Sequence, residues 1–249
     1  MAGHSHWAGI KHKKAANDAK RGKIWSKIAR TLIVAAKSGG GDPGQNLTLR
    51  YAIDEAKQAN MPKDTIEKAI KKGTGEGSTV SYESVLYEGY APGGVAIMAE
   101  ALTDNRARTG PELKKLFERN GGSLGTSGCV SYMFSKKGLI AINAEDTNED
   151  ELMELALSAG ADDMEKSGEL FEITCAPEAY DELKKALEDG NIPTEAAQLS
   201  MVPQNYIPIE DPEKARKIMR LVEEFEDHDD VQKVYANFDI SDEIMESLE

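Results

Sequence analysis

The first part of the chain contains the densest group of side chains that could bind an anion. Nine lysines and arginines lie within residues 11–37, with Asp18 as the only acid among them. Lys and Arg neutralise phosphates and release the counterions that surround a polyanion. The candidate contacts are Lys11, Lys13, Lys14, Lys20, Arg21, Lys23, Lys27 and Arg30, together with His4, His6, His12 and Trp7. The composition indicates a phosphate-binding surface; the alternative is an ordinary solvated helix face.

Histidines and tryptophans are interspersed with these cations. His4, His6 and His12 match no metal-ligand spacing and have no neighbouring carboxylate or thiolate. We therefore expect them to contact a phosphate or a base rather than a metal ion. Trp7 could offer a stacking face to an unpaired base. Trp25 shares an apolar stripe, so we expect it to pack in a core.

Two cysteines and two groups of glycines carry no chemistry in this interpretation. Cys129 and Cys175 lack a metal-ligand partner at short spacing, and we expect both to be buried free thiols. The glycines of residues 39–41 and 73–77 match neither a phosphate-binding loop nor a dinucleotide-binding motif. No nucleotide site is therefore predicted.

One polar cluster, residues 104–108, could resemble a catalytic loop. Asp104 and Asn105 are better explained as helix caps than as catalytic groups. The acidic run at residues 223–227 is typical of a solvated helix end. The sequence contains no convincing acid/base pair, nucleophile or metal signature, so we expect no enzymatic activity, no metal and no cofactor.

Charge is distributed unevenly along the chain. Residues 1–75 contain 15 basic and 6 acidic side chains, a balance of +9, whereas the remainder contains 15 basic and 38 acidic ones, a balance of −23. An acidic surface repels phosphate at long range. We therefore expect the N-terminal domain to meet nucleic acid and the acidic remainder to turn away from it.

Length and composition define the broad class of the protein. The chain has 249 residues, of which 40% are hydrophobic and 30% charged, as in soluble proteins of two or three domains. No apolar run approaches the roughly 20 residues of a membrane-spanning helix. The N-terminal residues contain no signal-peptide core. These features predict a cytoplasmic protein without a membrane partner.

Three helices are predicted to position the basic residues, because apolar side chains recur at helical spacing. The stripes are Ile24, Ile28, Leu32 and Ala36, then Leu49, Ala52, Ile53 and Ala56, then Ile66, Ala69 and Ile70. Breakers at residues 38–44 end the first helix. Asn60 closes the second, Pro62 begins the third and Gly73 stops it. An all-helical domain over residues 1–78 is expected.

Beyond residue 80 the pattern changes to short strands that alternate with helices. We expect strands at 84–87, 95–102 and 130–134, with a helix from Asn105 or Thr109 after the second. Residues 137–203 predict a ferredoxin-like βαββαβ unit, with strands at 139–142, 162–166, 170–174 and 197–202 and helices at 148–158 and 177–189.

A helix at 212–225 and a strand at 231–238 remain, and they would complete the earlier unit. The predicted fold class is α+β, with an N-terminal all-helical domain followed by two α+β, ferredoxin-like domains. The second domain comprises residues 79–136 and 204–249, and residues 137–203 form a third domain inserted into it.

Four long segments of the sequence occur together in a known family. They read MAGHSHWAGIKHKKAANDAKRGKIWSKIAR, NMPKDTIEKAIKKGTGE, YEGYAPGGVAIMAEALTDNRART and GGSLGTSGCVSYMF. In this order they resemble the YebC/PmpR family, from the first residue to the C-terminal strand. The resemblance implies a helical first domain and two α+β domains. Gly110 and Pro111 depart from the expected helix formers, which affects where the helix after residue 104 begins.

The resemblance also implies a role in gene expression. Bacterial members carry the label of transcriptional regulators with DNA-binding capacity, whereas a mitochondrial relative activates translation of cytochrome c oxidase, which implies RNA or the ribosome as partner. We expect a non-catalytic, DNA-binding regulator. The alternative is a translation factor on ribosomal RNA, favoured because no recognition helix is evident. An enzyme that uses residues 104–108 is the third hypothesis.

Overall fold

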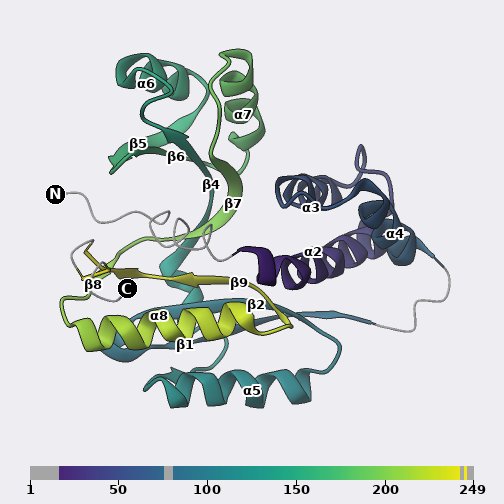
Figure 1. Ribbon diagram of the computed structural model, residues 1–249, viewed down its shortest axis with the longest axis vertical. Coiled ribbons are helices and arrows are strands. Elements are labelled where there is room, and N and C mark those ends of the chain that lie inside the picture. The colour runs from purple at the N-terminus through teal and green to yellow at the C-terminus, as the bar shows by residue number, and fades with distance from the viewer. Residues whose placement is uncertain (1–16, 76–80, 242–243, 246–249) are drawn as a thin grey trace. The chain divides into compact units, whose positions relative to one another are not determined.

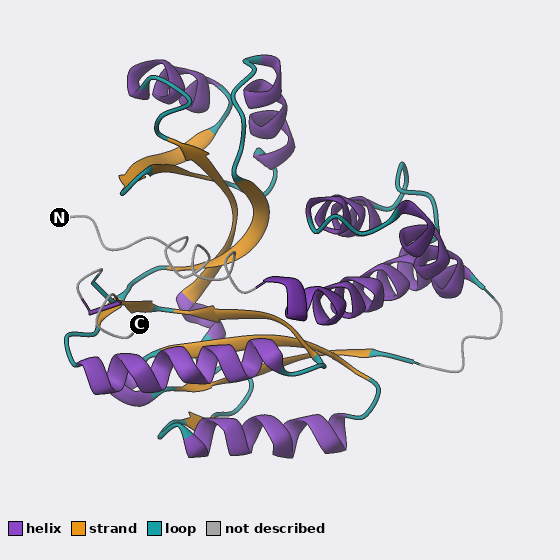
Figure 2. Cartoon of the chain, viewed as in Figure 1, coloured by secondary structure: helices purple, strands orange, loops and turns teal. Residues whose placement is uncertain are grey.

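The computed structural model describes residues 17–75, 81–241 and 244–245 (Figure 1). The described chain divides into two compact units. The first contains the described residues up to 129 together with 216–234, and the second contains residues 130–215 and those from 235 onward. Helices precede the first strand, and sheets with flanking helices follow it (Figure 2).

Three helices form the start of the first unit, as predicted. They are α2 (Asn17–Gly39), α3 (Leu47–Gln58) and α4 (Lys63–Thr74). Their apolar stripes meet in one core that includes Leu32, Leu49, Ala56 and Ile66, because side chains three and four positions apart share a helix face. Ile24 is the exception among the predicted stripe residues, since 39% of it is exposed.

Gly73 has a different role from the predicted helix stop. It lies inside α4 and is buried. A Cβ atom there would lie 2.5 Å from the carbonyl oxygen of Ile33 and 2.8 Å from the Cβ of Ala36. Glycine is therefore required because α4 approaches the backbone of α2 closely, which is a packing constraint that spacing alone does not show.

The first unit also contains a four-stranded sheet with the strand order β3-β1-β2-β9. The strands are β1 (Glu83–Tyr90), β2 (Ala96–Thr103), β3 (Ser123–Leu124) and β9 (Val231–Ala236). Two helices accompany the sheet, α5 (Arg106–Arg119) and α8 (Pro212–Asp227). The β1–β2 hairpin turns at Gly93 and Gly94, which have positive φ. Phe117 of α5 and Phe225 of α8 meet edge to face with ring centroids 4.9 Å apart, so these two helices pack against each other.

The predicted strand at residues 130–134 is wrong. Residues Ser131–Met133 form a 3-10 turn, in which Met133 N donates to the Val130 carbonyl, and Phe134 begins β4. Val130 and Phe134 are both buried on the two sides of this turn. The third strand is instead the two-residue β3, which the neighbouring glycines concealed in the sequence.

The second unit contains the predicted βαββαβ arrangement. Its elements are β4 (Phe134–Asn143), α6 (Glu149–Ser158), β5 (Ala161–Ser167), β6 (Leu170–Cys175), α7 (Tyr180–Asp189) and β7 (Ala196–Pro203). The strand order is β5-β6-β4-β7, the ferredoxin-like order, and the β4–β6 and β4–β7 pairs are antiparallel. β8 (Ile207–Pro208) and β10 (Phe238–Asp239) form a short parallel pair.

The predicted α+β fold class is confirmed. β9 joins the sheet of β1, β2 and β3, and the whole ferredoxin-like sheet lies between these strands in sequence. The predicted strand at 231–238 is divided at Asn237, whose carbonyl accepts from Ile207 N. The exact domain boundaries at residues 78, 136 and 203 remain a prediction.

Candidate nucleic-acid interface

Most of the predicted phosphate contacts lie outside the described residues. These are His4, His6, Trp7, Lys11, His12, Lys13 and Lys14, and the side chains of Lys20 and Arg21 on α2 are likewise outside. The structure therefore places three of the candidates, which are Lys23, Lys27 and Arg30. Because they are spaced by four and three residues, they share one face of α2.

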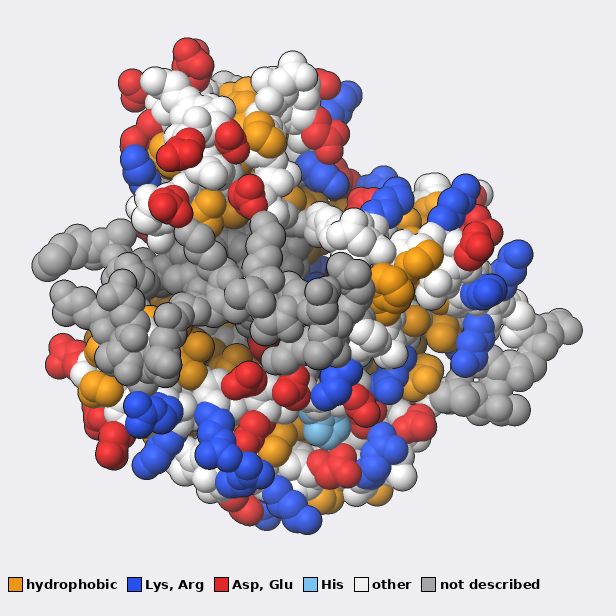
Figure 3. Space-filling view, viewed as in Figure 1, with side chains coloured by type: hydrophobic (Ala, Val, Ile, Leu, Met, Phe, Trp, Pro, Cys, Tyr) orange, Lys and Arg blue, Asp and Glu red, His pale blue; other side chains and the backbone are white. Residues whose placement is uncertain are grey.

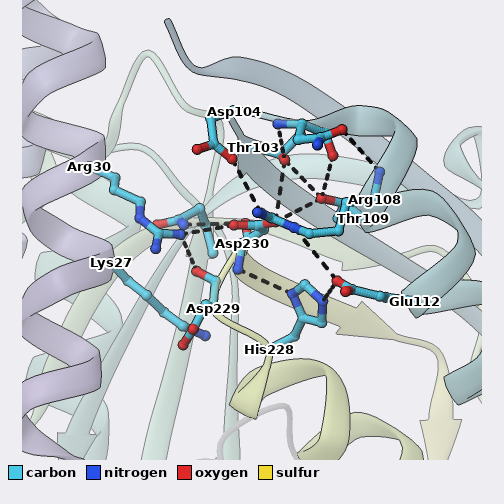
Figure 4. Close-up of polar contacts among 12 residues, drawn as sticks. Lys27, Arg30, Thr103, Asp104, Arg108, Thr109, Glu112, His228, Asp229 and Asp230 are labelled. Atoms are coloured by element: carbon cyan, nitrogen blue, oxygen red, sulfur yellow. Dashed lines mark hydrogen bonds and ion pairs between the residues drawn. The ribbon is translucent and has the colours of Figure 1, made fainter. Parts of the chain in front are cut away.

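This face of α2 meets the segment that connects α8 to β9 (Figure 4). We call this segment, residues 226–230, the acidic turn; its side chains are Glu226, Asp227, His228, Asp229 and Asp230. Lys23 Nζ donates to the Asp227 carbonyl at 3.4 Å, and Lys27 Nζ donates to the Glu226 carbonyl. Arg30 donates to the Asp229 carbonyl and to Asp230 Oδ1, the latter at 3.2 Å.

The contact changes the electrostatics of Lys27. Burial lowers the pKa of Lys27 to about 8, because desolvation of the ammonium outweighs the attraction of the acidic turn. Arg30 also lies over the ring of Tyr82, with its guanidinium carbon 5.8 Å from the ring centroid. Lys27 and Arg30 thus already have partners within the protein, and a phosphate would compete with these contacts.

Asp230 is the centre of the polar network in Figure 4. Its carboxylate accepts from Thr109 Oγ1 at 2.7 Å, Arg108 at 2.6 Å and Thr103 Oγ1 at 3.2 Å, in addition to Arg30. Burial would raise the pKa of Asp230, but the hydrogen bonds from Thr109 and Arg108 outweigh it and hold the pKa below its usual value. Donors surround the ionised carboxylate, as in a structural ion pair.

The polar cluster at residues 104–108 supports this network. Asn105 caps α5 by accepting from Arg108 N at 3.1 Å, which confirms the earlier of the two predicted helix starts. Asp104 pairs with the Arg108 side chain at 3.2 Å. Arg108 therefore bridges Asp104 and Asp230, and both acids have a structural partner.

His228 links the acidic turn to α5. Its Nδ1 accepts from Asp230 N at 3.1 Å, so its Nε2 carries the proton and faces Glu112 at 3.1 Å. Asp230 and His228 were not predicted to contact the cluster at residues 104–108. Both residues follow the acidic run at 223–227, which was interpreted as a solvated helix end, and no local signal singled them out.

Other cations of the helical segment are exposed. The side chains of Lys37, Lys68, Lys71 and Lys72 make no ion pair or hydrogen bond with any described residue. Sequence reasoning did not select them, although Lys68, Lys71 and Lys72 recur near the end of α4 in the run KAIKKG. They add available positive charge to the N-terminal segment.

The remaining predicted roles concern aromatic and sulfur groups. Trp25 packs against the helical core, and its Nε1 donates to the Ala59 carbonyl at 3.0 Å, so the expected core role is confirmed. Cys129 and Cys175 are free thiols; Cys175 is buried, which raises its pKa to about 11, whereas Cys129 is only partly buried. The described residues contain no group of three or more His, Cys, Asp or Glu that could hold a metal.

Among the described helices, none combines the length and apolar character needed to cross a membrane.

The chain matches known proteins over nearly its whole length. Residues 5–76 match the model of the TACO1/YebC protein N-terminal domain, and residues 82–238 match that of the TACO1/YebC second and third domain. A "Probable transcriptional regulatory protein" of Natranaerobius thermophilus is 52% identical over 99% of this chain and 100% of its own. A protein of the same name from Dictyoglomus thermophilum is 53% identical over 100% of both chains.

The fold is also similar to a solved structure. The crystal structure of a conserved hypothetical protein from Aquifex aeolicus has a TM-score of 0.86 and 50% sequence identity, covering 97% of this chain and 99% of that one. The two family models together span far more than half of the chain. The chain therefore belongs to the TACO1/YebC family.

Proposed function

We propose that this protein is a non-catalytic regulator of gene expression that binds nucleic acid through its N-terminal domain. The observation that carries the proposal is the concentration of cations in residues 11–37, nine against one acid, in a chain of net charge −14. Such a segment supplies phosphate contacts, and the acidic remainder orients the molecule by repulsion. Because relatives at about half identity are named probable transcriptional regulatory proteins, DNA is the first candidate partner.

The internal contacts of α2 reduce the number of residues that are proposed to bind nucleic acid. Lys27 and Arg30 hold the acidic turn, so the proposed contacts concentrate on Lys11, Lys13, Lys14, Lys20 and Arg21, with Lys23 at their border. Lys37 and the α4 lysines add exposed positive charge. His4, His6, His12 and Trp7 remain proposed contacts to phosphate or base.

A translation factor on ribosomal RNA is the second candidate. The balance of −23 outside residues 1–75 favours it, because a polarised chain suits one-sided docking on a crowded RNA particle. Either role belongs to a cytoplasmic protein that needs no cofactor. Catalysis is not part of the proposal, because the donors around Asp230 hold that carboxylate ionised in a structural role rather than poised as a base.

Charge reversal tests the proposal. The variant K13E/K14E/R21E/K23E in the full chain is compared with K136E/K137E/K166E/K185E, which changes the net charge equally in the second unit. Affinity for mixed-sequence duplex DNA and for ribosomal RNA is measured over a series of salt concentrations. The N-terminal variant is expected to lose roughly a hundredfold in affinity and much of the salt dependence. Binding equal to that of the control variant rejects the assignment.

Crosslinking in cells followed by sequencing of the bound nucleic acid separates the two candidates. Recovery of promoter DNA supports the transcriptional role. Recovery of ribosomal RNA supports the translational one.

A further inference from the structure

A second group of cations lies far from the N-terminal segment in sequence, on the outer sides of α5 and α8. Its members are Lys115, Arg119, Arg216, Lys217 and Arg220, and all five are exposed. We call them the α5–α8 cationic face. Figure 3 shows Lys and Arg side chains gathered over these two helices, on a molecule whose net charge is −14.

Helical spacing directs these side chains outward. Leu113 and Phe117 of α5 are fully buried, and Lys115 lies between them in sequence, on the opposite side of the helix. On α8, Ile218 and Leu221 are fully buried, whereas the neighbouring cations are exposed. The apolar sides of both helices thus pack in the core, and the cations lie on the solvent-exposed sides.

The two helices bring their cations together around one carboxylate. Arg119 of α5 and Arg220 of α8 both contact Glu224 Oε1 at 3.0 Å, and their side chains remain 60% and 56% exposed. Burial would raise the pKa of Glu224, but hydrogen bonds from Asn120 and Arg220 outweigh it and hold the pKa below its usual value. Two of the five cations therefore meet at a single ionised acid.

Three members of this face have no partner in the described part of the chain. The side chains of Lys115, Arg216 and Lys217 make no ion pair or hydrogen bond with any described residue. The neighbouring Glu118 is matched by Lys114, 3.7 Å away on the same helix. Uncompensated positive charge therefore remains at this surface.

The charge order along α8 is opposite to that which stabilises a helix. Residues 213–220 contain four basic side chains and one acid, and residues 221–227 contain four acids and no base. The helix macrodipole favours the reverse arrangement. The acidic end lies beside α2, where the charges of Glu226 and Asp227 attract the ammonium of Lys27. In the basic half, Arg220 pairs with Glu224 and Lys214 pairs with Asp211. The side chains of Arg216 and Lys217 have no partner among the described residues, which favours an external polyanion.

The chemistry of this face fits nucleic acid better than a membrane or a protein. Membrane-surface helices expose large apolar residues, and protein interfaces centre on aromatic or apolar anchors. None of the described large hydrophobic side chains that are exposed lies on α5 or α8. A surface of exposed Lys and Arg without such anchors is suited to phosphate contacts.

We propose that the α5–α8 cationic face is a second nucleic-acid contact, which binds the phosphate backbone without reading sequence. The proposal rests on the proposed function and adds a site to it. Two separate contacts on one polyanion raise the overall affinity, because the second contact forms within an existing complex. It also revises the expectation that the acidic remainder of the chain only repels phosphate.

The test removes the three unpartnered cations from the full chain. K115Q/R216Q/K217Q is compared with K136Q/K166Q/K185Q, which removes the same charge from exposed positions of the second unit. The probe is a mixed-sequence DNA duplex long enough to span both contacts, and circular dichroism verifies the fold. The first variant is expected to bind roughly tenfold more weakly at physiological salt and to lose about 3 from the slope of log affinity against log salt. The control is expected to keep the parent slope.

The outcomes separate this proposal from the proposed function. Equal affinity and slope for both variants, with weak binding by K13E/K14E/R21E/K23E, overturns the second contact and keeps the first. A lowered slope for K115Q/R216Q/K217Q alone supports the second contact. If the parent chain binds neither the duplex nor ribosomal RNA, both proposals fail.

Discussion

Two groups of cations in the first unit, on α2 and on the α5–α8 cationic face, have the same side chains and different surroundings. Lys27 and Arg30 donate to the acidic turn, whereas Lys115 and Lys217 are exposed without a partner among the described residues. The density of Lys and Arg in the sequence is higher around α2. A high density of cations in the sequence therefore does not identify a surface that is free to bind a ligand, because a segment distant in sequence can pair with those cations.

The two groups also differ in the carboxylate at their centre. The Asp230 side chain is 4% exposed and accepts from four side chains, two of them on α5. The Glu224 side chain is 20% exposed and faces an excess of cations. Asp230 acts as an internal anchor for α2 and α5, and Glu224 only reduces the charge of an open surface. Three substitutions test this contrast, in addition to the binding experiments above.

The largest effect is expected for Asp230→Ala. The change removes the charged acceptor shared by the buried hydroxyls of Thr103 and Thr109, together with the ion pairs of this carboxylate, which costs about 3 kcal/mol. The free energy of unfolding is measured by urea denaturation of the full chain. Asp229→Ala is the matched control, because Asp229 is exposed and meets Arg30 through its carbonyl, and it is expected to change stability by less than about 0.5 kcal/mol. Equal values for the two variants would contradict the role of Asp230.

A pH-dependent effect is expected for Lys27→Met. Native Lys27 has a pKa of about 8, against 10.5 as the ordinary value. Between these pH values the unfolded chain binds more protons at this residue, so the stability of the parent protein rises with pH relative to the variant. The free energy of unfolding of the parent, relative to that of the variant, is expected to rise by about 1–2 kcal/mol after allowance for solvent screening. Unfolding curves between pH 7 and pH 10.5 measure it.

Lys217→Met is the control for that series, because Lys217 is exposed on α8. A parallel pH dependence for the parent and Lys27→Met would show that the contact with the acidic turn does not bury the Lys27 ammonium.

The smallest effect is expected for Glu224→Gln. Loss of one negative charge from the α5–α8 cationic face is expected to raise the affinity for duplex DNA roughly threefold. Stability is expected to change by less than about 1 kcal/mol, because both arginine partners are more than half exposed. Glu188→Gln, exposed on α7, changes the net charge equally and serves as the control. Identical gains for both substitutions would mean that net charge alone sets the affinity.

Local signals predicted much of the fold. The helical stripes of α2, α3 and α4 and the ferredoxin-like unit followed from periodicity, and the Asn105 cap followed from its position before α5. The strand at 130–134 failed because an apolar run bounded by glycines does not distinguish a strand from a single 3-10 turn.

The candidate site was less predictable because its decisive contacts are not local. Arg30 and Asp230 are 200 residues apart in sequence. Nothing in either segment indicates that they meet. Arg30 was predicted to face phosphate, and Asp230 was given no role. The α5–α8 cationic face was missed for the same reason, since its cations come from two helices that are about a hundred residues apart in sequence.

The position of β9 has a consequence for how the protein is made. β2 pairs with β9, which lies more than a hundred residues later in the chain. During synthesis the sheet of β1 and β2 therefore keeps an open edge while the ferredoxin-like unit is translated and folds. An open strand edge is prone to pair with other chains. Nascent chains that stop before residue 231 should aggregate, and those that extend past residue 236 should not.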